Sequence, residues 1–226
     1  MNRKNFRRLS ARWAAAALLA TVTLVTGTAQ SKEPDTYAGL QRVERKGLDA
    51  VYIRPGATLA HYRRVMLDPV EVSFDKNWDP KGGRIGFDTA DPQKIRQDLA
   101  EIARDVFRDE LEKRGGYPLV TEPGPDVLRV RPQIVDLYIN APETDSPGIT
   151  RTFVIETGEM TLVADLLDSS TNTLIAHVKD RKRDQGFVGQ FQIANRVTNT
   201  AEARRAIGEW ARQLRNALDK AKETAP

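Results

Sequence analysis

The sequence predicts an α+β domain built from a mixed, mostly antiparallel sheet with two amphipathic helices packed on one face. Alternating apolar and polar residues indicate strands, whereas apolar residues that recur every three or four positions indicate helices. The strand pattern occurs at 70–74, 127–139, 160–166 and 174–178, and the helix pattern at 92–111 and 200–221. This order of strands and helices is typical of a sheet that is covered on one side.

The first 29 residues have the pattern of a secretory signal peptide. "MNRKNFRRLSAR" is basic and has no acid, "WAAAALLATVTLVTG" is uncharged and mostly apolar, and small residues stand at Gly27 and Ala29. A basic start, a short apolar core and a small-x-small exit are typical of export signals. The apolar run is short for a membrane span, which needs about 20 residues. We therefore expect residues 1–29 to be cleaved during export, with an uncleaved anchor helix as the alternative.

Charge and composition exclude several classes of function. The chain has 35 Lys+Arg and 31 Asp+Glu, but five of the basic residues and none of the acids lie in the first 29 positions. The rest of the chain is almost neutral, so it lacks the concentrated basic charge of a nucleic-acid-binding domain. The absence of cysteine excludes disulfides, thiol catalysis, thiolate metal sites and a lipid on an N-terminal cysteine. No second apolar run is long enough to span a membrane.

The next segments lead into the domain. Residues 30–50 are polar and contain Pro and Gly, which predicts an extended segment before a single domain over 51–222. Pro55 fixes its own backbone φ and Gly56 accepts a positive φ, so "RPG" predicts a turn.

Two short apolar runs follow this turn. Val70, Val72 and Phe74 alternate with polar residues and predict a half-buried strand, after a continuous run at 65–67. Pro69 stands between the two runs and has no N–H for a sheet, so we expect a bulge or an unpaired edge there. Residues 77–91 contain Pro and three glycines and predict a long loop.

The clearest predicted element is a helix that begins after Asp91. Asp91 suits the N-cap and Pro92 the first helical position, and Gly115–Gly116 suits the end of the helix. Its apolar face is formed by Ile95, Leu99, Ile102, Val106, Phe107 and Leu111.

Strands and a final helix complete the predicted domain. We expect a short strand at 117–121 and a long strand at 127–139, in which the inward face switches near 132–135 through a bulge. "DSSTNT" at 168–173 predicts the turn of a hairpin. The last helix is expected to begin near Thr200, capped by Asn199, with an apolar face formed by Ile207, Trp210, Leu214, Leu218 and Ala221.

The two histidines do not form a catalytic pattern. His61 precedes a predicted strand and is interpreted as a polar loop residue, although Asp68 and Glu71 follow it closely. His177 is expected on the solvated face of the hairpin. Two distant histidines without cysteine argue against zinc and copper sites. We therefore predict no catalytic, cofactor-binding or metal-binding residue, and no cofactor.

One basic segment is a candidate binding site. In "KDRKRD", Lys179, Arg181 and Arg183 share one face of a strand and could contact an anionic partner. The alternative is an edge strand that uses these charges to prevent aggregation, and we favour it because it requires no ligand.

Several segments resemble a known family. "YAGL" at 37–40, "VYIRPGATLAHYRRVMLDPVEVSF" at 51–74, "LLDSSTNTLIA" at 166–176 and "IGEWARQLRNALD" at 207–219 are similar to the domain-of-unknown-function family number 3313. This resemblance implies an exported envelope protein of Gram-negative bacteria, in a family with many lipoproteins. It implies no activity and no functional residue.

Together these patterns predict an exported cell-envelope protein that acts as a binding or accessory module. Its expected partner is an envelope protein or an anionic envelope component, and not a nucleic acid. One alternative is a periplasmic hydrolase acting on envelope glycans or lipids, which would need His61 or His177 to converge on two acids. Another is a structural envelope protein that pairs through an exposed sheet edge.

Overall fold

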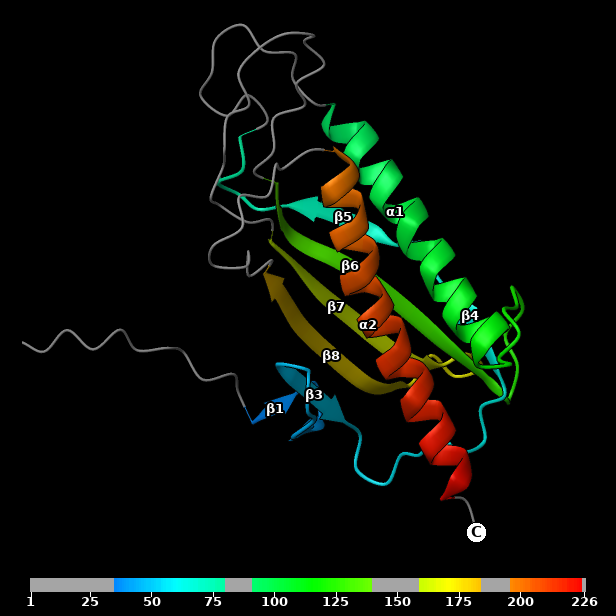
Figure 1. The fold of residues 1–226 in the computed structure, drawn as a ribbon. Coiled ribbons are helices and arrows are strands. Elements are labelled where there is room, and N and C mark those ends of the chain that lie inside the picture. Colours follow the sequence, from blue (N-terminus) through cyan, green and yellow to red (C-terminus); the bar gives the residue numbers. More distant parts are fainter. Residues whose placement is uncertain (1–34, 80–90, 140–158, 184–195, 225–226) are drawn as a thin grey trace, which may run out of the picture. The chain divides into compact units, whose positions relative to one another are not determined.

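An eight-stranded sheet forms one layer of the protein, and helices form the other (Figure 1). The structure is a computed structural model that describes residues 35–79, 91–139, 159–183 and 196–224. The strands are β1 (Thr36–Tyr37), β2 (Leu40–Val43), β3 (Ala50–Ile53), β4 (Arg64–Leu67), β5 (Glu71–Phe74), β6 (Val127–Tyr138), β7 (Glu159–Asp168) and β8 (Leu174–Arg183). The helices are α1 (Pro92–Arg108), the π-helix η1 (Asp109–Arg114) and α2 (Arg196–Glu223).

The sheet order confirms the predicted fold class. The strands lie in the order β1-β2-β3-β8-β7-β6-β4, and β5 also pairs with β6. All pairs are antiparallel except β4 with β6 and β5 with β6, which are parallel. α1 lies between β5 and β6 in the chain, so it forms the crossover that a parallel pair requires. Figure 1 shows α1 and α2 over the same face of the sheet.

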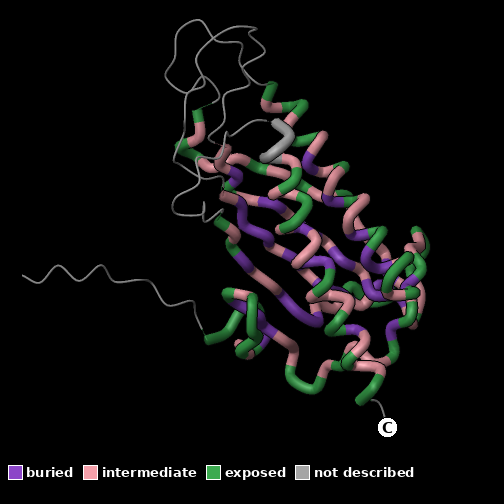
Figure 2. Tube along the Cα trace, in the orientation of Figure 1, coloured by how far each residue is buried: buried purple, intermediate pink, exposed green. Residues whose placement is uncertain are grey.

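α1 begins and ends where the sequence predicts. The Asp91 side chain accepts a hydrogen bond from the backbone N–H of Gln93 at 2.9 Å, and Pro92 is the first helical residue. The helical path continues through η1, and Gly116 follows with a φ of +66°. Leu99, Phe107 and other apolar residues of its inner face are buried against the sheet (Figure 2). Burial of such side chains contributes about 1.5–3 kcal/mol each, so packing holds this helix in place.

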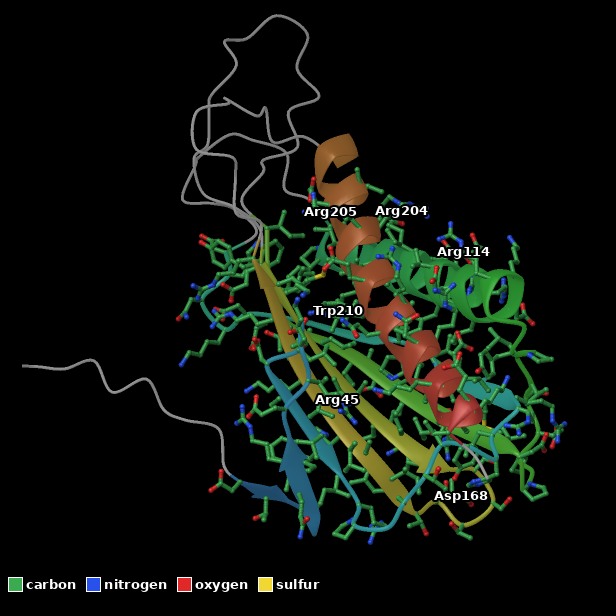
Figure 3. The ribbon with its side chains drawn as sticks, turned by 60° about the horizontal axis from the view of Figure 1, so that its bottom comes forward. Arg45, Arg114, Asp168, Arg204, Arg205 and Trp210 are labelled. Atoms are coloured by element: carbon green, nitrogen blue, oxygen red, sulfur yellow. The ribbon has the colours of Figure 1, made fainter. Side chains whose placement is uncertain are left out.

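α2 is longer than the sequence predicts. It begins at Arg196, so Asn199 lies inside the helix and does not cap it. Ile207, Trp210 and Leu218 are buried as expected. Trp210 lies between α2 and the sheet (Figure 3), where its indole N–H donates to the Asp180 carboxylate at 2.7 Å.

A break between β4 and β5 lies at the predicted position. Leu67 pairs with Val130 and Glu71 pairs with Gln133, so the link 68–70 passes beside Pro132 of β6. Proline has no N–H to donate to a neighbouring strand, and the ladder is interrupted at this level. The predicted switch of the inward face of β6 occurs later in the strand than expected, at a bulge between Val135 and Tyr138.

The predicted hairpin is formed by β7 and β8. In its turn, the Asp168 carboxylate accepts hydrogen bonds from the backbone N–H groups of Ser170 and Thr171 and from the hydroxyl groups of Thr171 and Tyr62. Burial opposes ionisation of Asp168, but these donors outweigh burial and hold its pKa below the ordinary value. Burial and the bond to Asp168 raise the pKa of Tyr62 above its ordinary value. The turn therefore fixes Tyr62 to the end of the hairpin.

Two segments differ from the sequence prediction. The sheet begins at Thr36, because the segment expected to be an extended lead-in contributes β1 and β2. The strand expected at 117–121 is reduced to an isolated parallel bridge between Leu119 and Val65. Most of the loop predicted at 77–91 and the signal peptide predicted at 1–29 lie outside the described residues.

Candidate functional site

The sheet face opposite the helices carries a row of polar side chains. We call this face the outer face. Tyr52 of β3 pairs with His177 of β8, His177 pairs with Asp165 of β7, and Asp165 pairs with Arg131 of β6. Cross-strand partners lie on the same face of a sheet, so these four side chains form one row across four strands. We call them the outer-face row.

The expectation that His177 is solvated is wrong. Only 7% of His177 is exposed, and its Nδ1 lies 2.7 Å from Oδ1 of Asp165. An ionised carboxylate can only accept a hydrogen bond, so Nδ1 carries the proton and donates it to Asp165. The imidazole ring stacks on the Tyr37 ring, with 3.9 Å between centroids and an 18° angle between planes. Tyr52 approaches the same ring at 6.1 Å.

The curl of the sheet explains why His177 is buried. β1 is three strands away from β8, and strands lie about 4.8 Å apart, so a flat sheet would separate them by about 14 Å. The contact between Tyr37 and His177 therefore requires the β1–β2 hairpin to fold back over the outer face. Leu40, Ala50 and Tyr52 form a small apolar cluster beneath this hairpin. Tyr37 itself remains 41% exposed.

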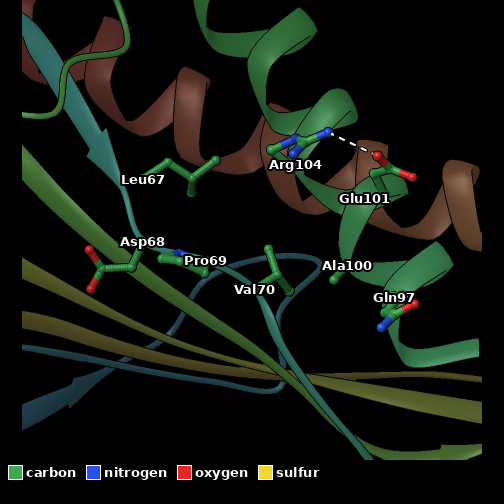
Figure 4. A pocket seen from close by; sticks show the side chains of 8 residues that line it. All are labelled: Leu67, Asp68, Pro69, Val70, Gln97, Ala100, Glu101 and Arg104. Carbon is green, nitrogen blue, oxygen red and sulfur yellow. Dashed lines mark hydrogen bonds and ion pairs between the residues drawn. The ribbon is translucent and has the colours of Figure 1, made fainter. Parts of the chain in front are cut away.

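Asp68 extends the polar surface toward β6. It lies in the link between β4 and β5, and its carboxylate points away from α1 (Figure 4). Nε of Arg129 lies 3.0 Å from both Asp68 oxygens, and Nε of Arg131 lies 3.4 Å from one of them. Arg129 also donates to Asn172 in the hairpin turn. These contacts fix the two guanidinium groups before any partner arrives.

His61 and Asp68 are not brought together by any hydrogen bond or ion pair in the described part of the chain. His61 is exposed in the turn before β4, as expected for a loop residue, and its ring contacts the Tyr62 ring at 3.9 Å. The Asp68 carboxylate is occupied by Arg129 and Arg131. Among the described residues, His177 pairs with a single carboxylate, whereas the hydrolase alternative needs two.

The basic row predicted at Lys179, Arg181 and Arg183 lies on β8. Arg181 and Arg183 both pair with Glu159 at the start of β7, and the backbone N–H of Arg181 donates to the Asp49 carboxylate. One carboxylate therefore compensates part of the charge of both arginines. Contact of this row with an anionic partner stays a prediction.

A groove lies on the other side of the β4–β5 link. It has a volume of about 530 Å³ and runs between this link and the exposed side of α1 (Figure 4). Leu67, Val70 and Ala100 form its apolar part, whereas Glu101 and Arg104 form an ion pair at its rim. Within the described residues, no cluster of three metal-ligating side chains occurs. No helix in that same part of the chain is long and apolar enough to cross a bilayer.

The sequence alone does not reveal the outer-face row for one main reason. Tyr37 and Tyr52 come from β1 and β3, and the contact of Tyr37 with His177 depends on the curl of the sheet. The pair of His177 and Asp165 could have been predicted from the sequence. A hairpin with its turn at "DSSTNT" places His177 opposite Asp165. The alternation of strand residues then puts both side chains on the same face.

A family model matches most of the chain. The family is described as "Protein of unknown function (DUF3313)", and the match covers residues 26–214. The protein belongs to this family. The resemblance seen in the sequence is therefore confirmed, and no curated protein matches the chain.

Several solved structures are similar in fold at low sequence identity. The PelC dodecamer from Paraburkholderia phytofirmans is 11% identical, with a TM-score of 0.34, and the match covers 72% of this chain and 94% of that chain. A candidate lipoprotein from Caulobacter crescentus is 12% identical, with a TM-score of 0.33 and coverages of 74% and 95%. A candidate neuraminyllactose-binding hemagglutinin homolog from Helicobacter pylori is 11% identical, with a TM-score of 0.38 and coverages of 74% and 90%.

Proposed function

We propose that this member of the family is an exported, envelope-associated binding module that recognises an envelope protein through the outer face of its sheet. The carrying observation is the exposed Tyr37, whose ring stacks on His177, which in turn is hydrogen-bonded to Asp165. Export is proposed from the signal-peptide pattern of residues 1–29.

The composition of the outer face supports recognition of a protein. Tyrosine and arginine are enriched among the residues that contribute most to binding at protein interfaces. The outer face offers the exposed Tyr37 together with Arg129 and Arg131, and each arginine is already paired with Asp68, whereas Tyr52 is buried. Side chains that are fixed before binding lose less conformational entropy when a partner docks.

The charge balance of the outer face favours a partner of mixed charge. Arg181 and Arg183 share Glu159, Arg129 and Arg131 share Asp68, and His177 pairs with Asp165. Charged groups that are already paired in this way contribute more to the orientation and specificity of an interface than to its affinity.

Site-specific photo-crosslinking tests this proposal. A photoreactive phenylalanine analogue placed at Tyr37 in growing cells should give a discrete adduct with an envelope protein. The same analogue at Asn216, which is exposed on α2, is the matched control and should not give that adduct. Identical adducts at both positions, or none at Tyr37, would contradict recognition through the outer face.

The His177–Asp165 pair supplies one of the two carboxylates that the alternative, a hydrolase acting on envelope glycans or lipids, would need. A histidine held by a carboxylate can act as a general base. Turnover of isolated cell-wall glycan or lipid by the purified protein, lost in His177→Gln, would favour the hydrolase. A Tyr37 adduct of the unchanged chain, together with no turnover by the purified protein, would favour the binding module.

A further inference from the structure

Glu110, at the junction of η1 and α2, is a buried carboxylate surrounded by arginines. Only 4% of Glu110 is exposed. Its Oε2 lies 3.1 Å from Nη1 of Arg114, and its Oε1 lies 3.2 Å from Nη1 of Arg215 and 4.0 Å from Nε of Arg212. We call these four residues the Glu110 arginine cluster. It lies on the helical layer, on the opposite side of the sheet from the outer face.

The local structure holds these arginines close together. Arg114 is four residues after Glu110, and Arg212 and Arg215 lie on one face of α2. Gly208 stands one turn before Arg212, and a side chain there would reach Val106 of α1, so the two helices approach closely at this point. Gly115 similarly leaves room for the Arg215 stem, because a Cβ at residue 115 would lie 2.9 Å from Cγ of Arg215.

The cluster has more positive charge than its carboxylate can balance. Three guanidinium groups surround Glu110, and Arg215 has a further, weaker contact with Asp219 at 3.8 Å. The Asp219 carboxylate also accepts the hydroxyl hydrogen bond of Tyr117 at 2.7 Å. Among the described residues, no other acid forms an ion pair with Arg114 or Arg212. The cluster therefore has a surplus of positive charge.

Hydrogen-bond donors are also in surplus in the cluster. Each guanidinium carries five N–H donors, whereas one carboxylate offers about four acceptor sites. Nε of Arg215 is buried and makes no hydrogen bond within the described part of the chain. Arg114 and Arg212 are 64% and 51% exposed at the side chain, so their remaining donors are accessible from solvent. Arg204 lies about two turns before Arg212 and adds a further basic side chain to α2 (Figure 3).

We propose that the Glu110 arginine cluster binds a phosphate group, with Arg114 and Arg212 as the principal ligands. A phosphate offers several oxygens, and guanidinium forks bind such oxygens with two parallel, charge-assisted hydrogen bonds. Glu110 orients the guanidinium groups, and its own negative charge weakens the binding of phosphate. The phosphate could be free or part of the headgroup of an envelope lipid, since the recognised chemistry is the same.

The experiment measures phosphate binding by the purified full chain with isothermal titration calorimetry at low salt. The double variant Arg114→Gln/Arg212→Gln should bind inorganic phosphate about tenfold more weakly, or worse, because two charge-assisted contacts are lost. The matched control is Lys94→Gln/Arg104→Gln, which removes the same charge from two exposed basic residues of α1 that pair with Asp98 and Glu101. Its affinity should change less than about twofold, in line with weak, screened surface charges.

Two further variants separate specific binding from unfolding and from net charge. Arg114→Lys/Arg212→Lys keeps the charge but loses the planar fork, so it should bind with intermediate affinity. Glu110→Gln removes the competing negative charge, so phosphate should bind it more tightly than the unchanged chain. At equal ionic strength, phosphate should also raise the melting temperature of the unchanged chain more than chloride does.

Lipid vesicles distinguish the two sources of phosphate. Vesicles of phosphatidylcholine with and without phosphatidylglycerol are sedimented with each protein. Binding of inorganic phosphate without binding of vesicles identifies a free-phosphate site, and vesicle binding that is lost in the Arg114/Arg212 glutamine variant identifies a lipid headgroup. Equal loss in the Lys94/Arg104 control, or unchanged binding in the cluster variant, would overturn the proposal. Neither result depends on the Tyr37 crosslinking experiment, because the two sites lie on different sides of the sheet.

Discussion

The buried carboxylate of Asp180 joins three parts of the molecule, and its removal should be severely destabilising. Asp180 is 2% exposed and accepts hydrogen bonds from the indole N–H of Trp210 at 2.7 Å and from the backbone N–H of Asp49 at 3.1 Å. The Lys182 ammonium lies 3.1 Å from the same carboxylate. Asp180 therefore connects α2, the segment before β3, and its own strand β8.

The expected cost follows from these contacts. Asp180→Ala leaves the buried indole N–H of Trp210 without an acceptor, which costs about 1–3 kcal/mol, and it removes the acceptor of the Asp49 N–H, which lies at an exposed residue. Among the contacts of the described residues, Lys182 keeps its weaker ion pair with Glu209 at 3.6 Å. We expect a total loss of about 3–5 kcal/mol, as for other broken buried ion pairs. Trp210→Phe removes one donor and a small volume, and should cost about 2 kcal/mol.

Urea unfolding at pH 7, followed by far-ultraviolet circular dichroism, measures these losses. The double variant gives the coupling energy between Asp180 and Trp210, which should be about 1.5–3 kcal/mol for a hydrogen bond to a charged group. Asp109→Ala is the control, because Asp109 pairs with Lys113 on the surface and should contribute no more than about 1 kcal/mol. A loss below about 1 kcal/mol in Asp180→Ala, or a coupling energy near zero, would refute this reasoning.

Four further predictions use simple measurements. Leu99→Ala should lower the free energy of unfolding by about 2–5 kcal/mol, since Leu99 is buried between α1 and the sheet; a loss below about 0.5 kcal/mol would contradict this packing. His61→Ala should change it by less than about 0.5 kcal/mol, because His61 is exposed, and an abolished phenotype with an unchanged melting curve would make His61 a functional residue. The depressed pKa of Asp168 means that its ionised form stabilises the fold above the unfolded pKa of about 3.9, and that this contribution is lost as the pH falls through the lower, folded pKa. The urea midpoint should therefore fall between pH 5 and pH 3, and less steeply in Asp168→Asn. Mass spectrometry of the exported protein should find an N-terminus near Gln30, whereas an intact Met1 on membrane-bound protein would contradict cleavage.

Local patterns in the sequence were sufficient for the elements that are stabilised by local rules. The helix after Asp91 could be predicted because its cap, its proline and its apolar period all agree. The hairpin could be predicted because Asp168 hydrogen-bonds the backbone of its own turn. The break at Pro69 followed from the missing N–H of proline.

The parts that could not be predicted depend on contacts between distant segments. β1 and β2 are only two and four residues long, so they show no alternating apolar pattern, and β3 reaches the rest of the sheet only by pairing with β8. The burial of His177 depends on that pairing. The Glu110 arginine cluster likewise requires α2 to pack against η1, because a glutamate four residues before an arginine has the pattern of an ordinary surface ion pair.

The pairing of β3 with β8 has a consequence for how the chain folds. The hydrogen bond from Asp49 to Asp180 joins residues 131 positions apart, so this side of the sheet has a high contact order. Closing a loop of this length lowers the chain entropy before the new contacts stabilise the fold, so folding is slower. In a nascent chain that ends before residue 174, β8 has not yet been synthesised. β3 then has no strand of the main sheet to pair with, and β1 and β2 cannot join the sheet through it. We therefore expect the α1–β6–β7 region to form first and the N-terminal strands to dock last, after synthesis of β8 is complete.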